Sequence, residues 1–160
     1  MKSDYLVLFS GGTGGHVIPA VNYGNYLIDC DYNCTLFLDK RGLKYANRFK
    51  GKVLCINSAH FSGNILFKLK SIFFLLYGLM QSFYYLIKIK PSHCFSFGSY
   101  SSFMPLIVAL VLKTLKITKI HLHEQNSIIG KVNLFFSPFS NNIFINFDNI
   151  VNLKSSYAKK

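Results

Sequence analysis

A glycine-rich segment near the amino terminus carries the strongest chemical signal in the sequence. It reads Ser10-Gly-Gly-Thr-Gly-Gly-His16 and directly follows the short apolar run at residues 5–9. Its four glycines lack the Cβ atoms that would hold a ligand away from the backbone, and they permit positive φ angles. If a helix begins here, its free N–H groups and its dipole attract phosphate, and Thr13 adds a hydroxyl donor. The segment therefore predicts a binding site for a phosphate-bearing ligand.

The glycine pattern leaves more than one class of phosphate ligand open. A dinucleotide-binding fingerprint, G-x-G-x-x-G, can start at Gly12, but Val17 stands where its third glycine belongs. Asp39, at the end of the second apolar run, could then serve as the acid that binds the ribose. No Gly-Lys-Ser/Thr sequence follows the glycines, which excludes a P-loop. A nicotinamide- or flavin-dependent oxidoreductase therefore stays open as an alternative.

Two further polar segments occupy comparable positions later in the chain. Ser96-Phe-Gly-Ser-Tyr-Ser-Ser102 follows one apolar run and His123-Glu-Gln-Asn126 follows another, each ahead of a helical window. The carboxyl ends of parallel strands share one edge of a sheet, and ligands of open α/β folds bind in the crevice at that edge. We therefore expect all three polar segments to meet at one site.

Alternating strand-like and helix-like segments must position these loops. Short continuous apolar runs that end at polar residues or glycines are typical of buried parallel strands, and Pro19 stands where a first helical turn would start. The expected strands are 5–9, 34–38, 52–56, 94–97, 117–123 and 142–147, and the expected helices are 19–29, 42–50, 64–89, 101–115 and 129–136. This alternation predicts an α/β domain with a mostly parallel sheet and helices on both faces.

The helical window 64–89 is the most apolar part of the chain. It carries no charge between Ser71 and Ile87, and lysines flank that stretch. A membrane-spanning helix needs about 20 apolar residues, so this one is short for a span and more typical of a helix packed on a sheet. The face expected to pack consists of Leu69, Ile72, Phe73, Leu76, Met80, Phe83 and Ile87. The side chains nearer the lysines are expected to contact an anionic membrane surface: Phe74, Leu75, Tyr77 and Tyr85.

Composition narrows the class of protein. The 160 residues are 51% hydrophobic and 15% charged, which fits one folded domain and excludes intrinsic disorder. The net charge of +12 favours an anionic partner, but the lysines are dispersed or flank apolar helices, so nucleic acid is not expected. The cysteines lack the spacing of a zinc site, and His121 and His123 lack an evident third ligand, so no metal is expected. No secretory signal is recognisable, which predicts a cytoplasmic protein.

Three motifs together resemble one known family. Gly11-Gly-Thr-Gly-Gly-His16, Gly98-Ser-Tyr100 and His123-Glu-Gln-Asn126 come in the order and spacing of the MurG family. Its members transfer N-acetylglucosamine from UDP-N-acetylglucosamine to undecaprenyl-diphospho-N-acetylmuramoyl-pentapeptide in peptidoglycan synthesis, on which cell shape and division depend. The resemblance implies the Rossmann-like amino-terminal half of a GT-B glycosyltransferase. It also implies that no cofactor is needed and that the protein binds peripherally to the cytoplasmic face of the bacterial inner membrane.

The same resemblance implies roles for individual residues. His16 or Glu124 would act as the general base toward the acceptor hydroxyl, and imidazole groups accept a proton near neutral pH. The residues expected to bind substrate are Gly12, Thr13, Gly14, Gly15, Gly98, Ser99, Tyr100 and Asn126. The second motif is normally G-x-G-G-Y, and here Ser96 and Ser99 replace its outer glycines. A Cβ at each position is expected to narrow the approach of the acceptor diphosphate.

The resemblance further implies how the enzyme is divided. Residues 1–150 correspond to the acceptor- and membrane-side domain, and residues 151–160 to the start of an interdomain linker or a tail. The carboxyl-terminal domain that binds most of the UDP-sugar is absent from this sequence, which is a separately encoded half, a truncated gene product or a fragment of a longer protein. In the first case a separately encoded partner would supply that domain. Two alternatives stay open: a non-catalytic half that binds the lipid diphosphate, and the dinucleotide-dependent oxidoreductase.

Overall fold

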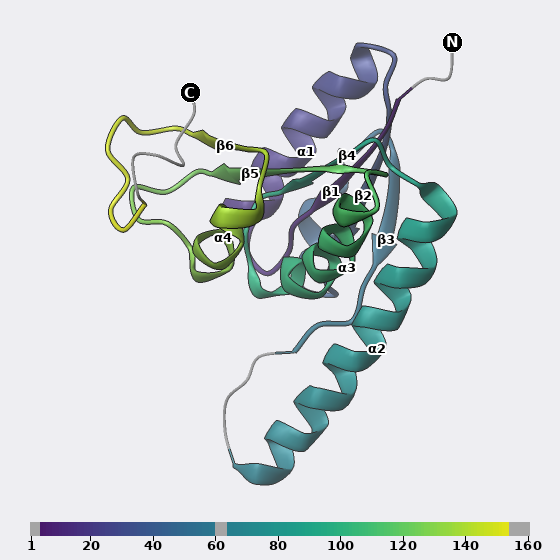
Figure 1. Ribbon diagram of the computed structural model, residues 1–160, viewed down its shortest axis with the longest axis vertical. Helices are drawn as coiled ribbons and strands as arrows, with labels where there is room; N and C mark the ends of the chain where they lie inside the picture. The colour runs from purple at the N-terminus through teal and green to yellow at the C-terminus, as the bar shows by residue number, and fades with distance from the viewer. Residues whose placement is uncertain (1–3, 60–63, 154–160) are drawn as a thin grey trace.

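The computed structural model describes residues 4–59 and 64–153, so the expected tail from residue 154 onward lies outside the described residues. Six parallel strands form one sheet in the order β3-β2-β1-β4-β5-β6 (Figure 1). The strands are β1 (Tyr5–Phe9), β2 (Asn33–Leu38), β3 (Lys52–Cys55), β4 (His93–Ser96), β5 (Lys119–Glu124) and β6 (Asn142–Ile145). The helices are α1 (Gly14–Asp29), α2 (Ile65–Ile89), α3 (Phe103–Thr114) and α4 (Lys131–Phe136), with 3-10 turns η1 (Leu43–Tyr45), η2 (Tyr100–Ser102) and η3 (Ser137–Phe139). The parallel α/β sheet predicted from the sequence is confirmed.

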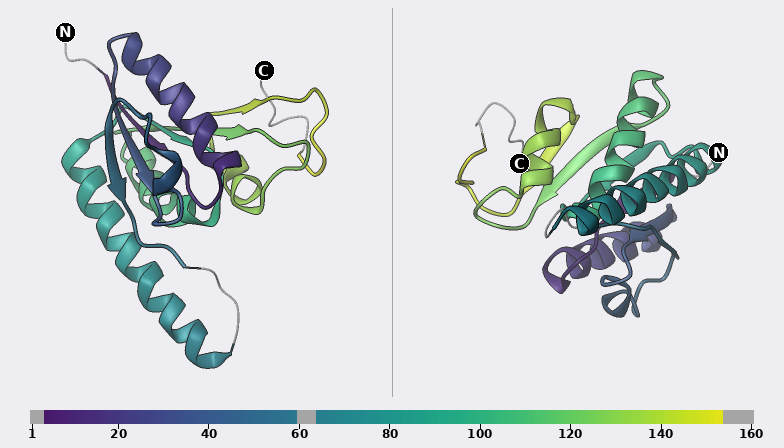
Figure 2. Two further views of the ribbon diagram at one scale, coloured as in Figure 1. Left: turned by 180° about the vertical axis from the view of Figure 1, so that it is seen from behind. Right: turned by 90° about the horizontal axis from the view of Figure 1, so that it is seen from below.

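Helices cover both faces of the sheet. Alternate residues of β1 point to opposite faces: Leu6 and Leu8 pack in a hydrophobic cluster with α1, whereas Val7 and Phe9 pack in another with α2, α3 and α4. Figure 2 shows α1 on one side of the sheet and α2 with α3 on the other. Because β1 is covered on both faces, its sequence is a continuous apolar run.

The strand order changes direction between β1 and β4, and this fixes where a ligand can enter. The chain proceeds outward from β1 to β2 and β3, then returns to place β4 on the other side of β1. Phe9 at the end of β1 pairs with Ser96 at the end of β4, so the loops that follow both strands leave the sheet side by side. A crevice at such an edge is the usual ligand site of open parallel sheets.

Helix α1 begins earlier than predicted. It starts at Gly14, and Pro19, which was expected in the first turn, lies inside the helix. The N–H groups of His16 and Val17 both donate to the Thr13 carbonyl at 3.2 Å. The glycine loop therefore turns directly into the helix, with no spacer between them.

The predicted helix at residues 42–50 is wrong, because only the 3-10 turn η1 forms there. Asn25 of α1 supplies hydrogen bonds that this segment would otherwise make within a helix. Its Oδ1 accepts from the Lys50 N–H at 2.8 Å, and its Nδ2 donates to the Arg48 carbonyl at 2.8 Å. A tertiary contact thus replaces local helix formation.

The packing face predicted for the helix at 64–89 is also wrong. In α2 the side chains of Phe73 and Met80 are 67% and 70% exposed, while Gly78 and Ser82 on the opposite side are buried. At Gly78 the helix comes so close to the chain after β3 that an added Cβ would lie 1.9 Å from the Asn57 carbonyl oxygen. Small residues therefore pack against the body of the domain. The large apolar residues predicted to pack are all exposed instead: Leu69, Ile72, Phe73, Leu76, Met80, Phe83 and Ile87.

The four side chains expected at a membrane divide between the two sides of α2. Tyr77 is exposed, and Phe74 and Leu75 are half-buried. Tyr85 is also half-buried, and its ring packs on Phe37 in the core with the ring centroids 6.1 Å apart. Their contact with a membrane stays a prediction. The helix is long and apolar enough over Lys68–Ile89 to cross a membrane, judged by length and composition.

An apolar groove, here called the α2–α3 groove, lies between the exposed side of α2 and α3. Its volume is about 680 Å³. The lining residues are Leu79, Met80, Phe83, Tyr84, Ile87 and Lys88 of α2 and Ile107, Val108 and Val111 of α3. Exposed apolar surface of this extent marks a contact with a partner or a membrane in soluble proteins.

Candidate functional site

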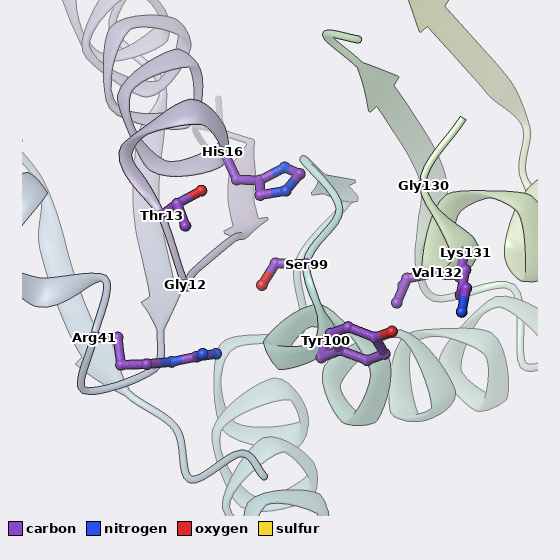
Figure 3. A pocket seen from close by; sticks show the side chains of 9 residues that line it. All are labelled: Gly12, Thr13, His16, Arg41, Ser99, Tyr100, Gly130, Lys131 and Val132. Carbon is purple, nitrogen blue, oxygen red and sulfur yellow. The ribbon is translucent and has the colours of Figure 1, made fainter. Parts of the chain in front are cut away.

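A pocket of about 310 Å³, here called the edge pocket, opens at the carboxyl edge of the sheet (Figure 3). The loop after β1, the loop after β2, the loop after β4 and the start of α4 all contribute to it. Its lining residues are Gly12, Thr13, His16, Arg41, Ser99, Tyr100, Gly130, Lys131 and Val132. The first two polar segments predicted to meet do so here. The third, His123–Asn126, also meets them: the Gln125 side-chain amide contacts His16 and donates to the Phe97 carbonyl at 3.0 Å, and the chain that follows lines the pocket at Gly130.

A buried carboxylate holds the glycine loop in place. Asp39, at the end of β2, is 3% exposed, and its Oδ1 accepts hydrogen bonds from the N–H groups of Gly12 at 2.8 Å and Gly42 at 3.0 Å. Its Oδ2 accepts from Nε of Arg41 at 2.7 Å. Gly12 adopts a φ of +75°, which glycine tolerates without strain. Because both of its oxygens are engaged, Asp39 positions the loop and a guanidinium group, which counts against the alternative in which it binds a ribose.

The amino end of α1 directs backbone donors toward the pocket. Thr13 is the N-cap residue, and its hydroxyl makes no capping hydrogen bond, so the hydroxyl is available to a ligand. The first N–H to bond within the helix is that of His16, so the N–H groups of Gly14 and Gly15 precede the helical ladder. The helix dipole adds partial positive charge at this end. This arrangement suits a phosphate group.

His16 has a defined orientation at the pocket wall. Its Nδ1 lies 2.9 Å from the carbonyl oxygen of Phe97, in the loop after β4. The side-chain amide of Gln125 contacts the same ring nitrogen and donates to the same carbonyl at 3.0 Å. These contacts engage Nδ1 and hold the ring in one orientation at the pocket wall, which leaves Nε2 as the ring nitrogen that can contact a ligand.

Glu124 is placed differently from His16, although both are candidate bases. It is 1% exposed and does not line the edge pocket. Its Oε1 accepts from the backbone N–H and the side-chain Nδ2 of Asn126, at 3.1 and 3.0 Å. Its Oε2 accepts from the Gly130 N–H and from Asn133 Nδ2, each at 3.0 Å. Four donors thus surround this carboxylate, which ties the loop after β5 to the start of α4.

Several other residues expected to bind substrate shape the pocket without lining it. Gly98 is buried and has a φ of +79°, so it forms the turn behind Ser99. Asn126 is exposed, but its amide nitrogen is committed to Glu124. Gly14 and Gly15 contribute backbone at the start of α1. Ser99 and Tyr100 line the pocket, together with Gly12, Thr13 and His16.

The two serines that replace glycines in the second motif have separate effects. Ser96 is fully buried and its hydroxyl accepts a hydrogen bond from the Gly98 N–H at 3.2 Å, so its side chain braces the turn. The expectation that it narrows the ligand's approach is wrong for this residue, which does not line the pocket. Ser99 does line the pocket, and its φ of +77° is a conformation that favours glycine.

The sequence reasoning missed the two cations of the pocket, Arg41 and Lys131. Both side chains are exposed, and they approach the pocket from opposite sides in Figure 3. Arg41 stands just after the second predicted strand and Lys131 just after Gly130, so their positions at the carboxyl edge could have identified them. Two cations and a helix amino terminus around one pocket form a site for a dianionic or larger anion.

Neither His93 nor His121 lines the pocket. His93 and His121 stack with ring centroids 5.1 Å apart, and Nδ1 of the first lies 2.9 Å from Nε2 of the second. Burial, followed by the charge of His93, lowers the pKa of His121 to about 4. Within the ranges that the structure describes, no group of three or more His, Cys, Asp and Glu side chains is placed to hold a metal ion.

Comparison with known proteins identifies relatives of the whole domain. Residues 6–145 match the glycosyltransferase family 28 N-terminal domain. A UDP-N-acetylglucosamine–N-acetylmuramyl-(pentapeptide) pyrophosphoryl-undecaprenol N-acetylglucosamine transferase from Wolbachia sp. subsp. Drosophila simulans is 40% identical over 131 residues, 82% of this chain. A transferase of the same name from Rickettsia canadensis is 36% identical over 148 residues, 92% of this chain.

Solved structures agree on the fold. MurG of Acinetobacter baumannii matches 94% of this chain and 44% of its own, with a TM-score of 0.75 and 22% sequence identity. A glycosyltransferase from Rickettsia africae matches 91% of this chain, with a TM-score of 0.58. The chain spans 35% of the length of the Wolbachia relative and 40% of the Rickettsia canadensis one. Since the match to the domain runs through nearly the whole chain, this protein belongs to the glycosyltransferase family 28 N-terminal domain family.

Proposed function

We propose that this domain is the acceptor side of an N-acetylglucosaminyltransferase of peptidoglycan synthesis. Its partners would be UDP-N-acetylglucosamine and the undecaprenyl-diphosphate-linked muramoyl-pentapeptide. The relatives' names state this donor and acceptor for those proteins. The observation that carries the proposal is the edge pocket, where a helix amino terminus, two cations and an oriented imidazole surround one space.

The acceptor diphosphate would bind between the loop after β4 and the start of α4. Ser99 and Tyr100 form one wall there, and Lys131 supplies a cation on the other. Arg41, oriented by Asp39, faces the glycine loop and would bind phosphate oxygens on that side. The acceptor sugar, which is joined to this diphosphate, would then lie near His16.

In the proposed reaction His16 is the base. The acceptor hydroxyl attacks the anomeric carbon of the donor sugar, and its proton passes to Nε2 of His16. The bond from the anomeric carbon to the UDP oxygen breaks with its electron pair, so UDP leaves and the configuration inverts. The N–H groups at the start of α1 would stabilise the negative charge on the departing diphosphate. Glu124, enclosed by its four donors, would position the loop rather than accept the proton.

Residues 1–150 would form the acceptor and membrane-side domain, with residues after 150 leading to a linker or tail. The carboxyl-terminal domain that binds most of the donor would be supplied by a longer form of this chain or by a separate polypeptide. This chain spans 35% and 40% of the length of two relatives, which leaves room for such a domain in the complete enzyme.

The domain would bind the cytoplasmic face of the inner membrane peripherally through α2. The exposed apolar side chains of this helix form a continuous face, and the ammonium groups of Lys70 and Lys88 lie 6.0 and 5.8 Å from the Phe74 and Tyr84 rings. Each lysine near an anionic bilayer contributes about 1 kcal/mol. Among the residues expected to contact the membrane, Tyr77 is exposed and can reach it, whereas Tyr85 faces the core.

Transfer of labelled N-acetylglucosamine to the lipid-linked acceptor in membranes tests the proposal. The assay is run with this chain alone and with a carboxyl-terminal family domain added as a second polypeptide. We expect activity only with both, and His16→Ala should then lower kcat by about 100-fold or more. His93→Phe is the matched control: it replaces a histidine outside the pocket with a ring that can still stack on His121, so it should leave kcat unchanged.

The two alternatives give different outcomes in this experiment. Binding of the lipid diphosphate without transfer, even with the added domain, would identify a non-catalytic binding half. Tight binding of a dinucleotide in place of the lipid diphosphate would support an oxidoreductase and contradict the proposal. Equal loss of activity in His16→Ala and His93→Phe would remove His16 from the role of base.

A further inference from the structure

A second cavity adjoins the edge pocket, and its walls are apolar. It has a volume of about 310 Å³ and is called the tail cavity here. Leu75 of α2, Phe103 and Met104 of α3, and Phe135 of α4 form its walls. The lining of the edge pocket is more polar, because cations, hydroxyl groups and backbone contribute to it.

The two cavities share one boundary. Tyr100, Lys131 and Val132 line both of them, and all three lie at the same side of the edge pocket in Figure 3. The Lys131 ammonium group is therefore the cation closest to the place where polar lining gives way to apolar lining. A ligand that fills both cavities must carry an anionic group joined directly to an apolar chain.

We infer that the tail cavity binds the first isoprenoid units of a polyprenyl diphosphate, with its diphosphate in the edge pocket beside Lys131. This inference rests on the proposed function, because the proposed acceptor joins a diphosphate to a long isoprenoid chain. Burial of the branched hydrocarbon against Leu75, Met104 and Phe135 removes its apolar surface from water. The phosphate contacts fix the chain's position and the cavity adds affinity.

The α2–α3 groove does not serve the same purpose. It shares no lining residue with the edge pocket, whereas the tail cavity shares three. Met80 and Phe83 of the groove lie on the outward side of α2. The groove is thus suited to the bilayer itself, and the tail cavity to the part of the chain that has left the bilayer.

Binding of small soluble diphosphates tests this inference without a membrane. Isothermal titration of the chain in detergent-free buffer compares inorganic pyrophosphate with farnesyl diphosphate below its micelle concentration. Farnesyl diphosphate should bind at least tenfold more tightly, a difference of about 1.4 kcal/mol. Leu75→Ser on α2 and Phe135→Ser on α4 each change the lining of the cavity, so each should remove most of this difference in affinity and leave the pyrophosphate affinity unchanged. Phe135 is 56% exposed, so its replacement leaves the core intact.

Met80→Ser is the matched control, because Met80 lies on α2 but lines the groove instead of the tail cavity. This variant should still bind farnesyl diphosphate at least tenfold more tightly than pyrophosphate. The inference is overturned if farnesyl diphosphate binds no more tightly than pyrophosphate, or if Met80→Ser loses the difference while Leu75→Ser keeps it. Failure of both ligands to bind would overturn the proposed phosphate site as well, which separates the two failures.

Discussion

The edge pocket and the α2–α3 groove are built in opposite ways. Beside the pocket, the buried carboxylates of Asp39 and Glu124 accept hydrogen bonds from the groups that shape its loops, so these loops are held in place without a ligand. In the groove, large side chains such as Met80 and Phe83 are more than half exposed. The pocket is thus preorganised for a ligand of defined charge and shape. The groove needs only an apolar phase to cover it.

Among the substitutions that test this contrast, loss of the Asp39 carboxylate should lower the free energy of unfolding the most. Asp39→Ala should lower the free energy of unfolding by about 4 kcal/mol, because it leaves buried donors without their acceptor. Asp29→Ala is the matched control: that carboxylate lies 2.6 Å from Lys50 Nζ but is exposed, so its loss should cost less than about 1 kcal/mol. Urea denaturation measures both variants. Similar losses in the two would contradict the role given to Asp39.

The two sides of α2 provide the next test. Gly78→Ala places a Cβ against the Asn57 carbonyl, and the required shift of the helix should lower the free energy of unfolding by about 3 kcal/mol. Met80→Ala on the exposed side should change it by less than about 0.5 kcal/mol. Thermal denaturation of both variants checks this. A reversed order would mean that α2 packs through the face that the structure leaves exposed.

Lowering the pH should destabilise the fold through His121, the buried member of the stacked histidine pair. The pKa of His121 is lowered to about 4, mainly by burial, from the 6.5 of an ordinary histidine. Between these values the unfolded chain takes up a proton that the folded chain does not, so stability falls as pH falls from 6.5 to 4. The expected loss is on the order of 2 kcal/mol, with solvent screening included. His121→Phe should flatten this part of the stability curve, and an unchanged slope would rule the pair out.

The smallest expected effect concerns the strained serine of the pocket. Ser99→Gly relieves a φ of +77° and should raise the free energy of unfolding by about 1 kcal/mol. Chemical denaturation measures the change, with Ser101→Gly, at a residue without positive φ, as the control. A stability gain in both variants, or in neither, would show that the backbone at Ser99 holds no strain.

Features encoded within a few residues could be predicted from the sequence. The apolar run at residues 5–9, the glycines behind it and the polar loops at the ends of later runs placed the strands and the edge of the sheet correctly. Each of these signals depends on local backbone preference and on burial from both faces. The position of the edge pocket follows from them because parallel strands end at a common edge.

Features that depend on distant contacts were beyond such reasoning. The side of α2 that packs is decided at Gly78 by its close approach to Asn57, and hydrophobic periodicity favoured the opposite side. Asn25 determines the conformation near Lys50 from another helix. Likewise, the four donors around Glu124 come from a folded loop, so its sequence position alone did not distinguish a base from a positioning residue.

The parallel bridge between Ile128 and Val151 determines how close to the pocket a second domain would be attached. Val151 also accepts the Ile129 N–H at 3.3 Å, so the chain after β6 returns to within two residues of Gly130 at the pocket rim. A domain joined there by a short flexible tether would meet the pocket at an effective concentration on the order of millimolar. The same domain supplied as a free polypeptide meets it only at its bulk concentration. A second domain on the same chain would therefore gain rate from this geometry, whereas one on a separate polypeptide would depend on its abundance or on confinement of both chains to one surface.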